Sequence, residues 1–265
     1  MKRTLTTLFT LCLFAVLLLT LAHATGTDIS AAFTDSNFLA RVYDALGKAP
    51  GEAITADECA GVKVLDVHGS GIESLAGIEY FTRLEELDSS DNQLTAIDLS
   101  RNARMKRLYV ESNRLSALDV SQLKTLEILN CSENLLTSLD ISQNKSLQWL
   151  DCSSNRITAL NVSYSMILER LYCQNNQLTS LDLRNNAALL ALDCSQNNMS
   201  SAFKVKGTFS LQMVQILAGN GQFKFYTQNR PGSIEKFPGY IFHAAPFYLI
   251  SFLLFPLRLI LGGFQ

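Results

Sequence analysis

A repeat of 21 residues runs through the middle of the chain and limits what it can fold into. From Leu84 the segments LEELDSSDNQLTAIDLSRNAR, MKRLYVESNRLSALDVSQLKT and LEILNCSENLLTSLDISQNKS follow one another, and three more units of the same length come after them. A 22-residue version precedes them from Val62, and a degenerate unit follows from Leu211. A fixed period of this length is typical of a solenoid, in which each unit packs only on its neighbours.

Each unit fits the pattern L-x-x-L-x-U-x-x-N-x-L, where U is small or apolar, which is the leucine-rich-repeat signature. Burying one apolar side chain of this kind gains about 1.5–3 kcal/mol, whereas ordering each residue costs about 1–2 kcal/mol of backbone entropy. One unit therefore cannot fold alone, and stacked units must share their apolar flanks. The pattern predicts an α/β-type solenoid with a parallel β-sheet on one face and an irregular or short-strand convex side.

The repeats and their flanks divide the chain into five expected segments. These are a signal peptide (1–24), a helical N-terminal cap (25–61), a solenoid of about seven units plus a degenerate eighth (62–221), a linker (222–236) and an apolar tail (237–265).

The first segment has the features of a secretion signal. Lys2 and Arg3 precede an apolar run from Leu8 to Leu21, and Ala22-His23-Ala24 is a small-x-small cleavage site. We expect cleavage after Ala24 and export to the cell surface or the medium, with an uncleaved anchor as the alternative.

The apolar tail has no charged side chain between Lys236 and Arg258. About 20 apolar residues of helix are needed to cross a hydrocarbon core, so 237–265 could associate with a membrane as a transmembrane anchor. The alternatives are a terminal element packed on the domain, a tail of little function and a cleaved glycolipid-anchor signal.

Two helix patterns precede the repeats. Asp35 or Ser36 can cap the first helix, and Gly47 can end it. Thr55 and Glu58 have the spacing of a capping box for a second, shorter helix. The first helix is indicated by apolar residues at helical spacing: Phe38, Leu39, Val42, Tyr43 and Leu46.

The segments FTDSNFLARVYDAL and VLDVHGSGIESLAGIEYFTRLEEL resemble the internalin-like class of bacterial surface leucine-rich-repeat proteins. The resemblance implies a helical cap and repeats that bind a protein or glycan partner. Several relatives carry an acid-rich loop between the two helices, but here that loop is GKAPGEAIT with the single carboxylate Glu52. We therefore expect no calcium site in the cap.

Three columns of polar or sulfur-containing residues recur in step with the repeat. The asparagines at position 9 are expected to form a structural ladder, because an amide can satisfy both donors and acceptors of a buried turn: Asn92, Asn113, Asn134, Asn155, Asn176 and Asn197. The cysteines at position 6 share their slot with valine and serine and are interpreted as packed thiols, with a disulfide or a metal as alternatives: Cys131, Cys152, Cys173 and Cys194. The acids at position 15 are interpreted as turn caps, with an acidic calcium-binding column as the alternative: Asp98, Asp119, Asp140 and Asp182, interrupted by Asn161.

Positions 3, 5 and 7 of each unit are expected to point outward from the sheet. The single tryptophan lies there with arginine and tyrosine nearby, which are the residue types that dominate binding interfaces. We interpret seven residues as the partner-facing patch: Arg107, Tyr109, Ile128, Trp149, Asp151, Arg170 and Tyr172.

Function is expected to be binding rather than catalysis. The chain has no glycine-rich phosphate loop and no nucleophile elbow, and beyond the flanking His23 and His243 its only histidine is His68, beside Asp66. A net charge of −2 gives no indication of a nucleic-acid partner. We expect a monomeric, extracytoplasmic binding protein without metal or cofactor, with a passive surface scaffold as the alternative and an enzyme as a remote one.

Overall fold

The computed structural model describes residues 26–200, 205–206, 212–217 and 222–226. The expected signal peptide, the apolar tail and the linker beyond Tyr226 lie outside these residues. Among the described residues, no helix combines the length and the apolar character needed to cross a bilayer.

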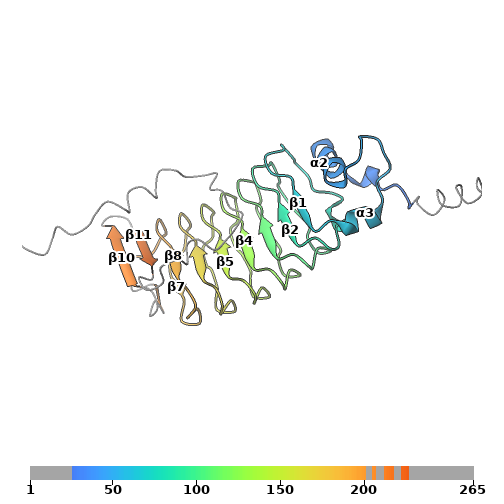
Figure 1. The fold of residues 1–265 in the computed structure, drawn as a ribbon. Coiled ribbons are helices and arrows are strands. Elements are labelled where there is room, and N and C mark those ends of the chain that lie inside the picture. Colours follow the sequence, from blue (N-terminus) through green and yellow to red (C-terminus); the bar gives the residue numbers. More distant parts are fainter. Residues whose placement is uncertain (1–25, 201–204, 207–211, 218–221, 227–265) are drawn as a thin grey trace, which may run out of the picture. The chain divides into compact units, whose positions relative to one another are not determined.

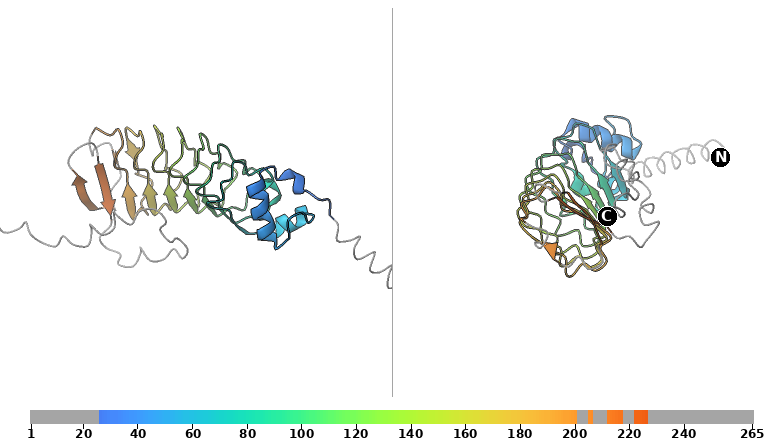
Figure 2. Two further views of the ribbon diagram at one scale, coloured as in Figure 1. Left: turned by 90° about the horizontal axis from the view of Figure 1, so that it is seen from above. Right: turned by 90° about the vertical axis from the view of Figure 1, so that its left-hand side faces the viewer.

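Seven short parallel strands stack along one face (Figures 1 and 2). They are β1 (Val64–Asp66), β2 (Glu86–Asp88), β3 (Arg107–Tyr109), β4 (Ile128–Asn130), β5 (Trp149–Asp151), β6 (Arg170–Tyr172) and β8 (Ala191–Asp193). Each strand pairs in register with the same positions of the next unit, as in Leu129 opposite Leu150. The predicted leucine-rich-repeat solenoid is confirmed, because one repeat makes one rung.

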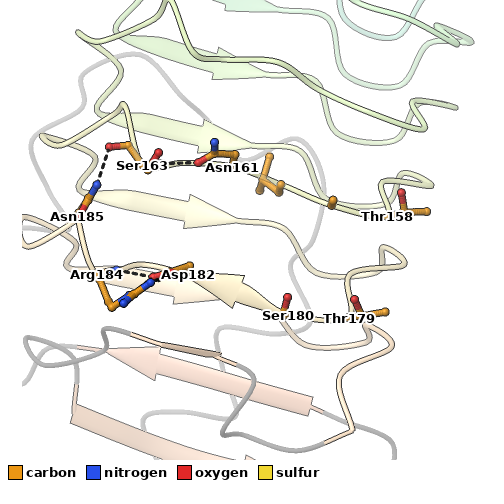
Figure 3. A pocket seen from close by; sticks show the side chains of 10 residues that line it. Thr158, Asn161, Ser163, Thr179, Ser180, Asp182, Arg184 and Asn185 are labelled. Atoms are coloured by element: carbon orange, nitrogen blue, oxygen red, sulfur yellow. Dashed lines mark hydrogen bonds and ion pairs between the residues drawn. The ribbon is translucent and has the colours of Figure 1, made fainter.

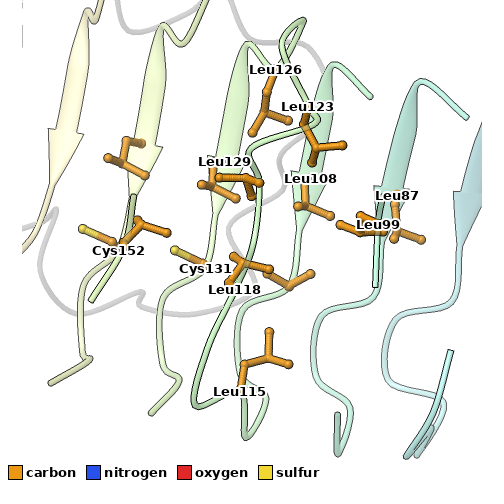
Figure 4. Close-up of a cluster of buried hydrophobic side chains, with 14 of the residues drawn as sticks. Leu87, Leu99, Leu108, Leu115, Leu118, Leu123, Leu126, Leu129, Cys131 and Cys152 are labelled. Atoms are coloured by element: carbon orange, nitrogen blue, oxygen red, sulfur yellow. The ribbon is translucent and has the colours of Figure 1, made fainter. Parts of the chain in front are cut away.

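The interior is filled by the apolar positions of the repeat. Figure 4 shows leucines of neighbouring rungs, among them Leu108, Leu126 and Leu129, directed into the space between the strands and the return segments. Each of these three side chains is fully buried, and so are Cys131 and Cys152. The cysteines of the column are free thiols, which agrees with their interpretation as packed side chains.

The position-9 asparagines join adjacent rungs. Asn134 donates from Nδ2 to the carbonyl oxygens of Val110 in the preceding rung (2.9 Å) and of Ser132 in its own (3.0 Å). Its Oδ1 accepts from the backbone N–H of Leu115 at 2.9 Å. The same pattern recurs at the other five asparagines, so each amide replaces backbone partners that the turn cannot supply.

The residue before each of these asparagines adopts a left-handed backbone conformation. Six non-glycine residues have φ between 52° and 54°: Asp91, Ser112, Glu133, Ser154, Asn175 and Gln196. This conformation costs a residue with a Cβ atom about 1–2 kcal/mol. The turn in each of these six rungs therefore stores strain that the asparagine hydrogen bonds must offset.

The N-terminal end carries two helices and two 3₁₀ turns. These are η1 (Ser30–Ala32), α2 (Ser36–Leu46), α3 (Ala56–Gly61) and η2 (Ile78–Tyr80). Asp35 caps α2, Gly47 ends it with φ of 64°, and Thr55 and Glu58 form the expected capping box at α3. Phe38, Val42 and Tyr43 of α2 are buried in the same core as the first rung.

The other end differs from the expected eighth repeat and linker. Strands β10 (Gln212–Leu217) and β11 (Gln222–Tyr226) form an antiparallel hairpin, and β11 pairs antiparallel with β8. The degenerate unit thus makes no parallel rung, and the first five residues of the expected linker belong to the sheet. On the convex side, β7 (Leu181–Asp182) pairs with β9 (Val205–Lys206).

Candidate functional site

The predicted partner-facing residues lie in two neighbouring columns of the sheet. Arg107, Ile128, Trp149 and Arg170 are register partners along β3 to β6 and form one column. Tyr109, Asp151 and Tyr172 lie in the second column, two residues further along each strand. We call these seven residues the sheet-face patch.

Trp149 and Tyr172 form an aromatic pair at the centre of this patch. Their ring centroids are 6.1 Å apart and the rings meet edge to face at 62°. Both side chains are half-buried, so each keeps a surface that a partner can cover. Such a pair holds its shape without a partner, because each ring restricts the rotamers of the other.

Tyr109 does not present the exposed surface that its position predicts. Only 5% of the residue is accessible, and burial raises the pKa of its phenol. Its flanks are Asp88 on β2 and Asn130 on β4. The ring is directed away from the core but is covered by its neighbours on the sheet face, so it supports the patch rather than forming its contact surface.

The serines at position 7 are also covered, although this position was expected to be open. Ser153 donates from Oγ to Oδ1 of Asp151 at 2.6 Å, and its backbone N–H donates to the same oxygen at 2.9 Å. The same pair of bonds recurs where a serine follows an acceptor at position 5. The serines of this type are buried: Ser90, Ser132, Ser153 and Ser195.

Asp151 is the titratable group of the patch with the largest consequence for pH. Burial among the side chains of the sheet face raises its pKa to about 6, and the two bonds from Ser153 offset this only partly. The neighbouring carboxylates Asp193 and Glu133 raise it further. The carboxyl therefore changes its charge near neutral pH.

Acidic groups outnumber basic ones on the sheet face. Arg107 is bound to Glu86, with 2.6 Å between Nη2 and Oε2. At positions 3, 5, 7 and 8 there are two guanidinium groups, those of Arg107 and Arg170, against eight carboxylates. These carboxylates are Asp66, Glu86, Asp88, Asp91, Glu111, Glu133, Asp151 and Asp193.

The first rung carries the carboxylate–imidazole pair that the sequence indicates. Nδ1 of His68 lies 2.6 Å from Oδ1 of Asp66, and this hydrogen bond raises the pKa of His68. Both side chains are more than half exposed, at 56% and 55%.

A groove lies on the return side of the solenoid, between the units that contain β5 and β6. It is an open groove of about 640 Å³ lined by polar residues, among them Thr158, Ser180 and Arg184 (Figure 3). Position 15 runs along it, and Oδ1 of Asn161 accepts from the backbone N–H of Ser163 at 3.0 Å. The four aspartates of this column accept from backbone N–H groups two residues later in the same way, which agrees with their interpretation as turn caps.

Comparison with known proteins finds similarity to Listeria internalins in sequence and in fold. Internalin J of Listeria monocytogenes is 38% identical over 70 residues, which is 26% of this chain and 8% of that protein. The solved structure described as the functional domain of InlJ from Listeria monocytogenes, which includes a cysteine ladder, is 33% identical with a TM-score of 0.48 and covers 66% of this chain. A structure of internalin C2 from the same species has a TM-score of 0.53 at 22% identity and covers 68% of this chain and 92% of its own.

The chain has the leucine-rich-repeat fold and is similar to Listeria internalins over part of its length. It spans 48% of the solved InlJ domain, in addition to the small share of full-length Internalin J given above. No family model matches the chain.

Two features of this solenoid are not predicted by the repeat pattern. A second column of buried asparagines occupies position 19 in alternate units: Asn102, Asn144 and Asn186. Asn144 donates from Nδ2 to the carbonyl oxygens of Val120 (3.0 Å) and Leu123 (2.8 Å), and its Oδ1 has no partner among the described residues. The spacing of 42 residues between these asparagines is the signal that could have indicated them.

The other missed feature is an apolar turn. Tyr164, Met166 and Ile167 are 49%, 65% and 48% exposed. The same positions are polar or small in the units that begin at Leu84, Met105, Leu126 and Leu168. The apolar character of this turn stands out in the sequence only when the units are aligned.

Proposed function

We propose that the protein is a non-catalytic binding protein that recognises a protein or glycan partner through the sheet-face patch. The observation that carries the proposal is the edge-to-face pair of Trp149 and Tyr172, partly exposed on a regular sheet. Aromatic side chains held in place before binding lose little conformational entropy when a partner covers them. Ile128 and Arg170 are the register partners of Trp149 on either side and extend the surface.

The charge of the sheet face favours a partner with basic groups. Eight carboxylates against two guanidinium groups give this face a negative potential, which steers a cationic partner toward it. The expected ligand therefore combines lysine, arginine or amino groups with a planar or apolar group that covers the aromatic pair.

The test uses two variants with matched chemistry. Trp149→Ala combined with Tyr172→Ala removes the aromatic pair, whereas Tyr164→Ala combined with Met166→Ala removes exposed apolar side chains from a turn outside the sheet. Each protein is immobilised and exposed to extracts of host cells or of the cell envelope, and the captured proteins are identified and their affinities measured.

A partner that needs the sheet face is lost by the first variant, with at least a hundredfold weaker binding, and kept by the second. If a partner binds both variants as tightly as the parent protein while circular dichroism shows an intact fold, the sheet face is not the binding surface. Capture of no partner at all by the parent protein would favour the passive surface scaffold.

Export is a second part of the proposal. The residues that support it are the signal-like segment up to Ala24 and the apolar tail from Phe237. Determining the N-terminus of the mature protein tests the first, and fractionation with and without residues 237–265 tests the second. We expect a mature N-terminus at Thr25 and loss of membrane association on truncation.

A further inference from the structure

Three potential metal ligands meet at the first two rungs. Asp66 ends β1, His68 lies two residues later on the same face, and Asp88 ends β2 as the register partner of Asp66. One ligand atom of each residue lies within 4.8 Å of the ligand atoms of the other two. The parallel register creates this cluster, because it places the ends of neighbouring strands side by side.

His68 makes this rung different from the others. At position 7 the units of β2, β4, β5 and β8 have serine, whose hydroxyl donates to the acceptor at position 5. In the first unit the hydroxyl is replaced by an imidazole that makes the corresponding contact with Asp66. An imidazole together with two carboxylates is a donor set suited to Zn²⁺ and similar divalent transition metals, whereas a hydroxyl is not.

Hydrogen bonds from Ser90 hold the carboxylate of Asp88 in place. The backbone N–H and Oγ of Ser90 both bind Oδ1 of Asp88, at 3.0 and 2.6 Å. Such hydrogen bonds orient a metal-binding carboxylate. Arg41 brings a positive charge near the cluster, but its Nη2 donates to the backbone carbonyl of Asp66 at 3.1 Å rather than to the carboxylate.

We propose that Asp66, His68 and Asp88 form a binding site for a divalent transition-metal ion, with Zn²⁺ as the best match. Metal–ligand bonds of about 2.0–2.2 Å place tetrahedral ligands about 3.4 Å apart. The Asp66–His68 contact must therefore open from 2.6 Å and Asp88 must approach, which the exposure of Asp66 and His68 allows. Three protein ligands leave a fourth position that faces solvent on the sheet face, where water or a donor from a partner can bind.

The experiment is a titration of the full-length protein with ZnCl₂, followed by calorimetry, with Co²⁺ absorption as a second readout. His68→Ser restores the residue type that other units use, so the fold is expected to survive. Asp88→Asn removes the carboxylate of the second rung and keeps an acceptor for Ser90. Ser153→Ala is the control, because it changes the same position of a rung that has no imidazole.

We expect one Zn²⁺ per chain that depends on the cluster, at least tenfold weaker binding in His68→Ser and in Asp88→Asn, and unchanged binding in Ser153→Ala. Co²⁺ is expected to give the visible absorption of a four-coordinate site in the parent protein and in Ser153→Ala, but not in His68→Ser or Asp88→Asn. Equal zinc affinity in the parent protein and in His68→Ser would overturn the proposal, and so would the absence of zinc binding at millimolar concentration. Neither outcome bears on the sheet-face patch.

Discussion

Single residues decide the stability of each rung through hydrogen bonds that the backbone cannot make for itself. Asn155 is an example, because its amide donates to Cys131 of the preceding rung (2.9 Å) and to its own turn, while Oδ1 accepts from Leu136. Loss of a side chain of this kind leaves several buried backbone groups without partners, at about 1–3 kcal/mol each.

We therefore expect Asn155→Ala to lower the free energy of unfolding by about 3 kcal/mol or more. The control is Asn161→Ala, since Asn161 is exposed and caps one turn through a single bond to Ser163. That variant is expected to cost about 1 kcal/mol or less. Urea denaturation followed by circular dichroism measures both, and equal costs would contradict the ladder role of Asn155.

Substitution of Asp91 measures the backbone strain at position 8 of the repeat. Its φ is 52°, a conformation that glycine adopts without cost. Asp91→Gly is expected to raise the free energy of unfolding by about 0.5 kcal/mol, because relief of strain exceeds the added entropy of the unfolded chain. Asp91→Ala removes the same side chain but keeps the strain, so it should be no more stable than the parent protein.

Asp151 makes the free energy of unfolding depend on pH, with a sign that follows from its raised pKa. Its pKa is raised to about 6 in the folded state, so the folded protein holds this proton more tightly than the unfolded chain. The resulting stabilisation is complete below about pH 4, the unfolded value, and is lost as the pH rises through about 6.

Asp151→Asn is expected to be more stable than the parent protein by about 1–2 kcal/mol at pH 7.5, with no advantage at pH 4. Asparagine fits this position, because Asn130 accepts the same two bonds from Ser132 one rung earlier. Denaturation curves across this pH range measure the difference. An advantage that does not change with pH would contradict the raised pKa.

At the scale of elements, one carboxylate bridges the start of the cap helix and the first repeat. Oδ1 of Asp35 accepts from Asn37 and Phe38 at the start of α2, and Oδ2 accepts from Glu73 and Ser74 in the first unit at 2.7 and 3.1 Å. Burial opposes the charge of Asp35, but these four N–H groups outweigh it and lower its pKa.

Asp35→Ala is expected to destabilise the protein by about 2–3 kcal/mol at pH 7, because it removes a helix cap and a contact between elements. A lowered pKa stabilises the fold above the unfolded value of about 4 and less as the pH falls through the folded value. The difference between the two proteins should therefore shrink below pH 4. Asp44→Ala, an exposed change at the other end of α2, is the control and should have little effect.

At the scale of the whole molecule, stability depends on stacking, since each rung contacts only its neighbours. A rung in the middle is held from both sides, whereas rungs at the ends have one regular neighbour, so local opening is expected to begin at the ends. The reactivity of the buried cysteines measures local opening of individual rungs. Four successive rungs each contain one of them: Cys131, Cys152, Cys173 and Cys194.

We expect a thiol reagent to label Cys194 and the cap residue Cys59 at least tenfold faster than Cys152 under native conditions. All five buried thiols should react together in denaturant. Labelling followed by peptide mass spectrometry measures each site. Equal native rates at every cysteine would show that the solenoid opens only as one cooperative unit.

The sequence alone determines the solenoid, its inward leucines and the turn at each rung. A repeat predicts its own packing partner, because the neighbour of each unit is another unit with the same pattern, and the caps of α2 and α3 follow from short local motifs. The hairpin of β10 and β11 and the cover over Tyr109 and the serines were decided only by the tertiary structure. The tertiary structure also decided that Asp88 lies beside Asp66 and His68. Such contacts depend on which side chains of adjacent rungs, about 4.8 Å apart, meet across the sheet. The pattern within one unit does not specify the size or charge of the neighbouring side chain in the next unit.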